Sequence, residues 1–345
     1  MTAASPGRRR PGDRDRLPVT YILPLRRDPV APATPASRTV ASAELDDLTC
    51  YLHAVAGWVD DPIVVDGSPP ATFAEHDRLW RRVVRHLAPD RTIADPPDKV
   101  SGVVTGARRA RHVVVVVADD DVRWSRGQLA DALERMTETG ADLLRPQNRF
   151  DPAPWHARWD TGRTLVNRAV GGDWPGTIVV RRDAVAAGYG YGVMFENLDL
   201  HRTVRARGGR TALARDLVVV RRPPSFGGFA HQRVRQAYDE IARPWRMAWQ
   251  LAIVPLAVVG GRNAIALMAA AAVATAEVGR RRGGRQGFPP TGPLWAPAWL
   301  AERGVCAWLA LGARARGGVR YRARRVRVAA TPVRAITVRP PAPGG

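Results

Sequence analysis

HVVVVVADDD, residues 112–121, is the stretch of sequence that decides the fold. Its five consecutive valines leave no polar face, so the segment predicts a β-strand covered on both sides, as strands of mainly parallel sheets are. Asp119, Asp120 and Asp121 follow this strand directly. Ligands of open parallel sheets bind where the strands end, which makes these aspartates the first candidates for a functional site.

Strands and helices alternate before this stretch. Residues 19–25 and 62–65 are short apolar runs that predict strands, whereas 43–58 and 73–87 carry apolar residues at helical spacing. Each strand, helix and next strand form a plausible βαβ unit. The pattern predicts an α/β domain whose mainly parallel sheet is flanked by helices, as in Rossmann-like folds.

The alternation continues after the aspartates. Residues 177–180 predict another strand. Residues 196–207 predict a helix, which is expected to end at Gly208 and Gly209. A chain of 345 residues is long enough for one such domain and an appendage.

Four regions are expected along the chain. They are a disordered basic tail at 1–16, the α/β catalytic domain at 17–240, a membrane-associated hydrophobic helical region at 241–312 and a basic C-terminal tail at 313–345. There are only two cysteines, which excludes a disulfide framework or a cysteine metal cluster and fits a reducing compartment.

The longest apolar stretch, residues 247–278, is interrupted by the Gly-Gly-Arg-Asn run at 260–263. Each half has about 15 residues, fewer than the roughly 20 that cross a bilayer core. A hairpin that dips into the membrane, or a tilted pair with Arg262 at the far surface, fits this pattern. A buried helical hairpin of a soluble protein is the alternative. A later segment, 294–311, is rich in tryptophan and predicts a helix lying in the membrane interface.

Positive charge is concentrated near the C-terminus. The formal net charge is +21, and Lys99 is the only lysine. From Arg280 onward the chain has 14 arginines and a single acidic residue, Glu302. A basic flank beside apolar helices indicates an anionic membrane surface on the cytoplasmic side. Nucleic acid is not expected as a partner, because the arginine excess lies in the tails and not on an aromatic-rich face of the folded domain.

The aspartate cluster requires a counter-charge. Carboxylates this close repel one another at neutral pH unless a cation neutralises them, and a divalent metal is the simplest such cation. Alternate residues of an extended segment point the same way, so Asp119 and Asp121 would share the metal and Asp120 would point away. Asp66 also follows a predicted strand. The alternative is that the aspartates are merely solvated or cap a helix that begins near Ser125.

The order of these motifs resembles the family 2 glycosyltransferases with the GT-A fold. The segments that carry the resemblance are VTYILP (19–24), IVVDGS (63–68), ADDDV (118–122), GTIVVRRD (176–183), ENLDL (196–200) and RARGG (205–209). A further run, QRVRQ at 232–236, is similar to the Gln-x-x-Arg-Trp motif of membrane-bound, ceramide-glucosyltransferase-like members. The resemblance covers roughly residues 17–240.

The resemblance implies an enzyme that moves a sugar from a nucleotide-diphosphate donor to a lipid or envelope glycan acceptor at the cytoplasmic membrane face. Asp119 and Asp121 would hold Mg²⁺ or Mn²⁺ against the diphosphate, and Asp66 would contact the base. The nucleotide-sugar site implied in this way consists of Pro24, Asp66, Lys99, Asp119 and Asp120.

An inverting displacement also needs a general base that takes the acceptor hydroxyl proton. The family's Glu-Asp pair reads Glu196-Asn197 here, and asparagine cannot accept that proton. Glu196 is the first candidate and Asp199, one turn along the same helix, is the second. Alternatively, both are ordinary acids at a helix N-terminus, stabilised there by the helix dipole.

Acceptor binding is predicted for three residues. Gln232 and Arg235 belong to the Gln-x-x-Arg run, in which Gln236 replaces the family's tryptophan. Trp174 lies in a segment rich in tryptophan and arginine, which suits sugar or headgroup recognition. A solvated basic helix and a core tryptophan are the alternatives. Because of Asn197 and Gln236, a catalytically impaired membrane-bound scaffold that binds sugars or nucleotides is the alternative to an enzyme.

Overall fold

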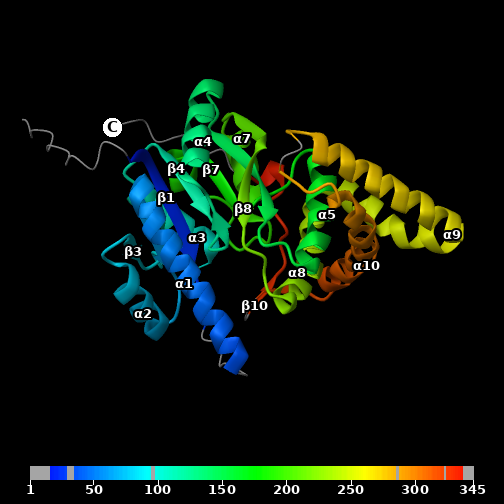
Figure 1. The fold of residues 1–345 in the computed structure, drawn as a ribbon, viewed down its shortest axis with the longest axis horizontal. Coiled ribbons are helices and arrows are strands. Elements are labelled where there is room, and N and C mark those ends of the chain that lie inside the picture. Colours follow the sequence, from blue (N-terminus) through cyan, green and yellow to red (C-terminus); the bar gives the residue numbers. More distant parts are fainter. Residues whose placement is uncertain (1–15, 29–34, 95–97, 285–286, 322–323, 337–345) are drawn as a thin grey trace, which may run out of the picture.

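The computed structural model describes residues 16–28, 35–94, 98–284, 287–321 and 324–336. The predicted α/β architecture is confirmed, with a mainly parallel eight-stranded sheet that carries helices on both faces (Figure 1). A C-terminal helical region with long apolar helices packs beside this domain, also as predicted. The tail predicted at 1–16 falls, except for Arg16, outside the described residues.

The strands, in chain order, are β1 (Leu17–Leu25), β2 (Val59–Asp66), β3 (Arg85–Leu87), β4 (Val114–Ala118), β5 (Val122–Arg123), β6 (Leu143–Phe150), β7 (Thr177–Arg181), β8 (Thr211–Arg221), β9 (Val319–Tyr321) and β10 (Arg324–Val326). The α-helices are α1 (Pro35–Trp58), α2 (Pro70–Trp80), α3 (Lys99–Arg109), α4 (Arg126–Thr139), α5 (Trp155–Ala169), α6 (Arg182–Ala186), α7 (Glu196–Ala206), α8 (Phe226–Tyr238), α9 (Pro244–Arg281) and α10 (Ala296–Ala315). Short 3-10 helices are η2 (Asp239–Ala242), η3 (Gly292–Trp295) and η4 (Val333–Ala335).

The large sheet has the order β3-β2-β1-β4-β7-β6-β8-β5. The first four of these strands are mutually parallel, and β6 is parallel to β8. Strand β7 runs antiparallel to both of its neighbours, and β5 runs antiparallel to β8. The carboxyl ends of β1, β2 and β4 therefore meet at one edge of the sheet.

The valine strand β4 is covered on both faces, as its sequence predicts. Val116 and Ala118 pack into a core shared with α1 and α4, whereas Val115 and Val117 pack into a second core with α3, α6 and α7. All four are at most 5% exposed. A strand buried on both faces cannot tolerate polar residues until it ends, so its aspartates come at the sheet edge.

Helix α3 brings the only lysine to this edge. Asp98 caps its N-terminus by accepting from the backbone N–H of Ser101, whose side chain in turn accepts from the Asp98 N–H. Gly106 allows the helix to lie close to β1, because a Cβ there would come within 2.6 Å of Ile22. Lys99, the first residue of the helix, is consequently placed beside the ends of the strands.

The predicted helix over 73–87 is wrong in its second half. Helix α2 ends at Trp80, which is fully buried, and residues 85–87 form β3, which pairs in parallel with β2. Apolar spacing does not distinguish the end of a helix from a three-residue strand, which is why the pattern misled.

Helix α9 is a hairpin of two arms. Gly261 has φ 57° and ψ −153°, which breaks the helix between residues 244–260 and 262–281. The hairpin projects from the end of the molecule opposite β3 (Figure 1). Val259 near its tip is 89% exposed. By length and composition α9 passes as a membrane-crossing helix, with a mean hydropathy of 1.8 over its most apolar window.

The last part of the chain returns to the domain. One face of α10 is buried, with Ala307 and Ala310 fully covered, so the helix predicted to lie in an interface also packs against α5, α8 and α9. The basic tail predicted at 313–345 is not simply a tail, because β9 and β10 form an antiparallel pair within it and Val319 joins the core of α8 and α10.

Candidate active site

A cavity of about 810 Å³ opens where the carboxyl ends of β1, β2 and β4 meet the C-terminal helices. One wall comes from the strand ends and the N-terminus of α3, and the other from α8, η2, α10 and β9. The sequence-predicted residues that line it are Pro24, Lys99, Asp119, Asp120, Asp121, Trp174, Glu196, Gln232 and Arg235. Two predicted residues, Asp66 and Asp199, are not part of its lining.

Asp119 and Asp121 face the same guanidinium, as the alternation argument predicts. Arg221, the last residue of β8, lies with Nε 2.7 Å from Asp121 Oδ2 and with Nη2 3.9 Å from Asp119 Oδ2. Asp120 instead holds the turn, because its carbonyl accepts a 2.7 Å hydrogen bond from Arg123. Gly176 lies against Asp119 so closely that a Cβ there would come within 2.7 Å of Asp119 Oδ2.

One carboxylate oxygen of Asp121 lacks a hydrogen-bond partner among the described residues. This atom, Oδ1, is buried. Burial, together with the neighbouring acids Asp119 and Asp120, raises the pKa of the Asp121 carboxyl to about 6, although Arg221 opposes the shift. A buried carboxylate oxygen without a partner is costly, and its environment suits a ligand that supplies positive charge.

The donor set fits a divalent cation in part. Asp119 and Asp121 offer two carboxylates, including the unpartnered oxygen, at the mouth of a cavity large enough for a diphosphate. Across residues 16–336, gaps excepted, no three His, Cys, Asp or Glu side chains gather in a metal-binding group. The remaining oxygens of a Mg²⁺ or Mn²⁺ shell would come from water and substrate, as is usual for Mg²⁺ beside phosphates.

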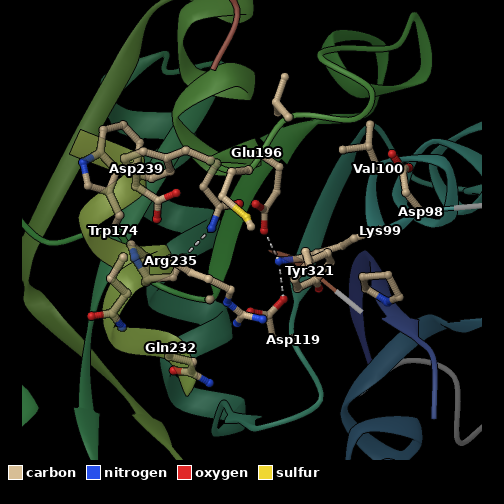
Figure 2. A pocket seen from close by; sticks show the side chains of 18 of the residues that line it. Asp98, Lys99, Val100, Asp119, Trp174, Glu196, Gln232, Arg235, Asp239 and Tyr321 are labelled. Atoms are coloured by element: carbon tan, nitrogen blue, oxygen red, sulfur yellow. Dashed lines mark hydrogen bonds and ion pairs between the residues drawn. The ribbon is translucent and has the colours of Figure 1, made fainter. Parts of the chain in front are cut away.

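Lys99 joins the acidic cluster to the predicted base. Its Nζ lies 2.6 Å from Asp119 Oδ1 and 2.5 Å from Glu196 Oε1 (Figure 2). Burial alone would lower the pKa of Lys99, but Asp119 and Glu196 outweigh it and raise the pKa well above the ordinary value. The lysine is therefore a fixed positive charge within the cavity.

Asp66 does not reach the cavity, contrary to the predicted contact with the base. Its side chain turns inward, where Oδ2 lies 2.6 Å from His76 Nδ1 and 3.2 Å from His86 Nε2. Hydrogen bonds from both histidines and from Ser68 overcome burial and hold the pKa of Asp66 far below its usual range. Its neighbours Val65 and Gly67 line the cavity instead.

Asp199 is also structural, so it cannot serve as the second candidate base. It is 1% exposed, and its oxygens accept from the backbone N–H groups of Gly190 at 2.8 Å and Thr331 at 2.6 Å. Asn197, which replaces the family's aspartate, faces the cavity and donates to the Pro175 carbonyl at 2.7 Å. Glu196 is left as the candidate base.

Of the predicted acceptor residues, Gln232 and Arg235 lie on the opposite wall, whereas Trp174 lies in the loop before β7. Trp174 stacks with Arg145, whose guanidinium carbon is 3.9 Å from the ring centre. Gln232 and Arg235 project from α8, and Arg235 lies over the ring of Tyr321 at 4.8 Å. Figure 2 places these side chains across the cavity from Asp119.

Several lining residues were missed by sequence reasoning. Trp299 and Arg303 come from the predicted membrane region and Tyr321 from the predicted tail, whereas Asp239 lies at the end of the predicted catalytic domain. Only the fold brings them to the cavity, and their spacing in the sequence gives no signal.

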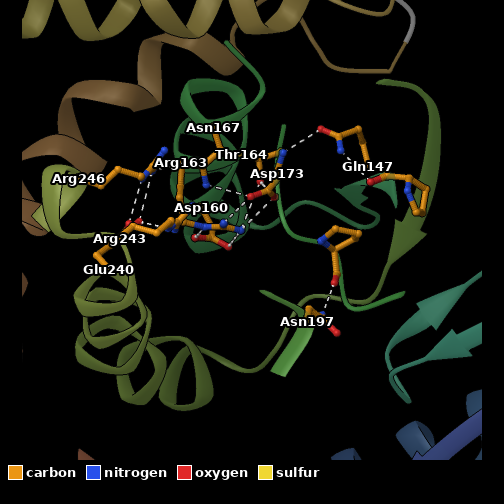
Figure 3. A network of polar contacts seen from close by, with 12 residues as sticks. Gln147, Asp160, Arg163, Thr164, Asn167, Asp173, Asn197, Glu240, Arg243 and Arg246 are labelled. Atoms are coloured by element: carbon orange, nitrogen blue, oxygen red, sulfur yellow. Dashed lines mark hydrogen bonds and ion pairs between the residues drawn. The ribbon is translucent and has the colours of Figure 1, made fainter. Parts of the chain in front are cut away.

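A buried polar network fixes this second wall to the domain (Figure 3). Arg163 of α5 lies 2.9 Å from Asp160 and 2.8 Å from Asp173. Arg246 of α9 lies 3.0 Å from Glu240 and donates to Asn167 at 2.6 Å. The network ties α5 to η2 and α9.

No protein-family model matches the sequence, and no curated protein does. Solved structures with weak similarity exist. Mannosyltransferase PcManGT from Pyrobaculum calidifontis, in complex with GDP-Man and Mn²⁺, is 19% identical over 92% of this chain and 80% of its own, with a TM-score of 0.43. Mannosyl-3-phosphoglycerate synthase from Rubrobacter xylanophilus is 15% identical over 65% and 74%, with a TM-score of 0.42.

Glucosyl-3-phosphoglycerate synthase from Mycobacterium tuberculosis, in complex with Mn²⁺, UDP and phosphoglyceric acid, is 20% identical over 66% of this chain and 78% of its own, with a TM-score of 0.39. At these identities and TM-scores, the activity of the present chain has to be inferred from its own residues.

Proposed function

We propose that this protein is a metal-assisted glycosyltransferase of the GT-A type, which moves a sugar from a nucleotide-diphosphate donor to a lipid or cell-envelope acceptor. The observation that carries the proposal is the pairing of Asp119 and Asp121 at the end of β4, beside Lys99 and facing a cavity of about 810 Å³. Acids and a partly buried lysine at the ends of parallel strands suit a diphosphate and its metal.

Glu196 acts as the general base in this proposal. It accepts the proton of the acceptor hydroxyl, whose oxygen bonds to the anomeric carbon while the bond from that carbon to the diphosphate breaks, with its electron pair on the diphosphate. One displacement of this kind inverts the configuration. A Mg²⁺ or Mn²⁺ ion held by Asp119 and Asp121 would neutralise charge on the departing diphosphate. Lys99 adds a second positive charge there.

Membrane association is the second part of the proposal. Apolar side chains near the hairpin tip are exposed, with Val258 at 77%, Val259 at 89% and Leu267 at 72%. The base of the hairpin is buried at Ile253 and Ala272, so residues 254–260 of the first arm and 262–271 of the second project, or roughly 10–15 Å of helix. That length suits insertion into one leaflet, and the C-terminal arginines favour the cytoplasmic one.

Calorimetry on the full chain in detergent tests the donor site. UDP, GDP and dTDP are titrated with and without Mn²⁺, and we expect binding of at least one of them to require the ion. Asp121→Asn should weaken this binding at least about tenfold, whereas Arg210→Gln, on the surface before β8, should not. Absence of Mn²⁺-dependent binding for all three nucleotides would overturn the proposal.

A scaffold without catalysis is the second candidate, because Asn197 is locked to the Pro175 carbonyl and Glu196 is already paired with Lys99. Release of nucleoside diphosphate from a panel of nucleotide sugars separates the two. A transferase releases it, and Glu196→Gln abolishes the release while nucleotide binding stays intact. A scaffold binds without release, and Glu196→Gln then changes nothing.

A further inference from the structure

The second wall of the cavity holds a buried arginine whose charge is poorly compensated. Arg303 of α10 is 1% exposed and lines the cavity, yet its Nε and Nη1 have no hydrogen-bond partner among the described residues. Its Nη2 lies 3.9 Å from a carboxylate oxygen of Glu302. A guanidinium that is removed from water without hydrogen-bond partners lowers the stability of the folded protein, so a ligand that supplies partners would explain its presence.

Other unsatisfied groups on the same wall are donors of Trp299 and Arg243 and two acceptors, Gln236 Oε1 and Asp239 Oδ1. The indole Nε1 of Trp299, a residue 1% exposed and one turn before Arg303, has no acceptor in the described structure. Arg243, which follows η2, has an unpartnered Nε although its Nη2 donates to Glu240 at 2.8 Å. The unsatisfied atoms of Arg303, Trp299 and Arg243 are all donors, so a ligand that fits them offers acceptors.

The charge of the wall points the same way. Its lining includes three arginines, Arg235, Arg243 and Arg303, and two acids. Of the acids, Glu240 is engaged with Arg243 and Arg246, while burial and nearby acids raise the pKa of Asp239 well above its usual value. The wall therefore carries excess positive charge.

We propose that this wall binds a phosphate group of the acceptor, held by Arg303 and by the Trp299 indole. The guanidinium offers a charge-assisted hydrogen bond, and a dianion supplies the counter-charge that Arg303 lacks. The inference rests on the proposed function, since it places the donor at Asp119 and the phosphorylated acceptor opposite it. The phosphate belongs either to a soluble phosphomonoester or to a lipid headgroup.

Binding is measured by calorimetry on the full chain in detergent, with glycerol 3-phosphate as the soluble probe and mixed micelles containing phosphatidic acid as the lipid probe. Glycerol and phosphatidylcholine micelles are the matched controls. Each titration is made with and without Mn²⁺ and UDP or GDP. We expect one phosphate probe to bind in both conditions, and the probe that binds identifies the source.

Arg303→Gln should weaken that binding about tenfold or more, while Arg314→Gln, an exposed arginine on the same helix, should leave it unchanged. If Arg303→Gln fails to fold, Trp299→Phe decides, because it keeps an aromatic ring and removes the indole N–H donor. The affinity for the phosphate probe should then fall several-fold. Three results would overturn the inference. They are an unchanged affinity for the phosphate probe in Arg303→Gln or Trp299→Phe, complete displacement of the probe by the nucleotide, and binding of glycerate as tight as that of the probe.

The two proposals fail separately. Arg303-dependent phosphate binding without any Mn²⁺-dependent nucleotide binding would sink the donor assignment and leave the subsite in place. Mn²⁺-dependent nucleotide binding without Arg303-dependent phosphate binding would overturn the phosphate subsite and leave the donor assignment in place.

Discussion

The ammonium group of Lys99 lies beside a carboxylate that is proposed to bind the metal ion. Its Nζ contacts Asp119 at 2.6 Å, and the same carboxylate is proposed as a metal ligand. Replacement of the lysine by methionine removes a competing cation, so the affinity of the nucleotide-free protein for Mn²⁺ should rise, by about three- to tenfold. Sugar transfer should fall, because the diphosphate loses a positive contact.

Titration calorimetry with Mn²⁺ checks this, with Arg109→Met at the other end of α3 as the control. Weaker Mn²⁺ binding in Lys99→Met would show that the lysine orients the carboxylate for the ion and does not compete with it.

The Asp66 cluster gives stability a pH dependence. Burial would lower the pKa of His86, but the hydrogen bonds that it donates to Asp66 and Asp77 outweigh burial and raise that pKa. A histidine with a raised folded-state pKa contributes stability that is complete below its unfolded pKa of about 6.5 and is lost as the pH rises through the folded value. The free energy of unfolding should therefore fall from pH 6 towards pH 9.

Urea unfolding at a series of pH values measures this slope. His86→Gln should be less stable than the wild type at pH 6 and should show a flatter profile above it. His53→Gln, a substitution on the exposed side of α1, serves as the control. A slope that His86→Gln does not change would mean that other groups cause it.

Single residues also show where sequence reasoning stops. Asp119 and Asp121 follow the end of β4, where the sequence puts them, because a buried strand must end before it can carry acids. Asp66 follows a strand in the same way, but its carboxylate is captured by His76 and His86, which only α2 and β3 bring within reach. Adjacency to a strand end predicts position along the chain, whereas the direction of a side chain depends on partners elsewhere.

At the scale of elements, α5 and α10 approach closely through a glycine. A Cβ on Gly162 would lie 2.8 Å from the backbone of Trp295 and Ala296, where neither can yield. Gly162→Ala should therefore destabilise the protein by about 1–3 kcal/mol, measured by thermal or urea unfolding. Gly57→Ala in α1, with no atom within 4 Å of the added methyl group, should be neutral or stabilising.

The elements with strong patterns were predictable and the short ones were not. The valine strand and the helix that begins at Glu196 appear where expected. The reversal of β7, antiparallel to β4, was not expected, because residues 177–180 read as one more apolar strand and carry no sign of direction. Strand direction is decided by connections that periodicity does not encode.

At the scale of the whole molecule, the hairpin should determine where the protein resides. The double substitution Val259→Asp and Leu267→Asp puts two charges on the exposed tip, so binding to vesicles that contain anionic lipid should fall at least about tenfold. Co-sedimentation with the vesicles measures it. Val113→Asp, at a residue 52% exposed on the α/β domain, is the matched control. Unchanged sedimentation of the double variant would argue for a protein partner at the hairpin.

The network of Asp160, Arg163, Asp173, Glu240 and Arg246 also sets rules for anyone who redesigns the molecule. A chimera that exchanged the helices from α8 onward for those of another protein would remove Arg233 and Arg246, which contact Asp160 and Asn167 of α5, and a truncated α/β domain would face the same problem. The transplantable module therefore begins within the first domain, at α5, long before the point where the sequence changes character.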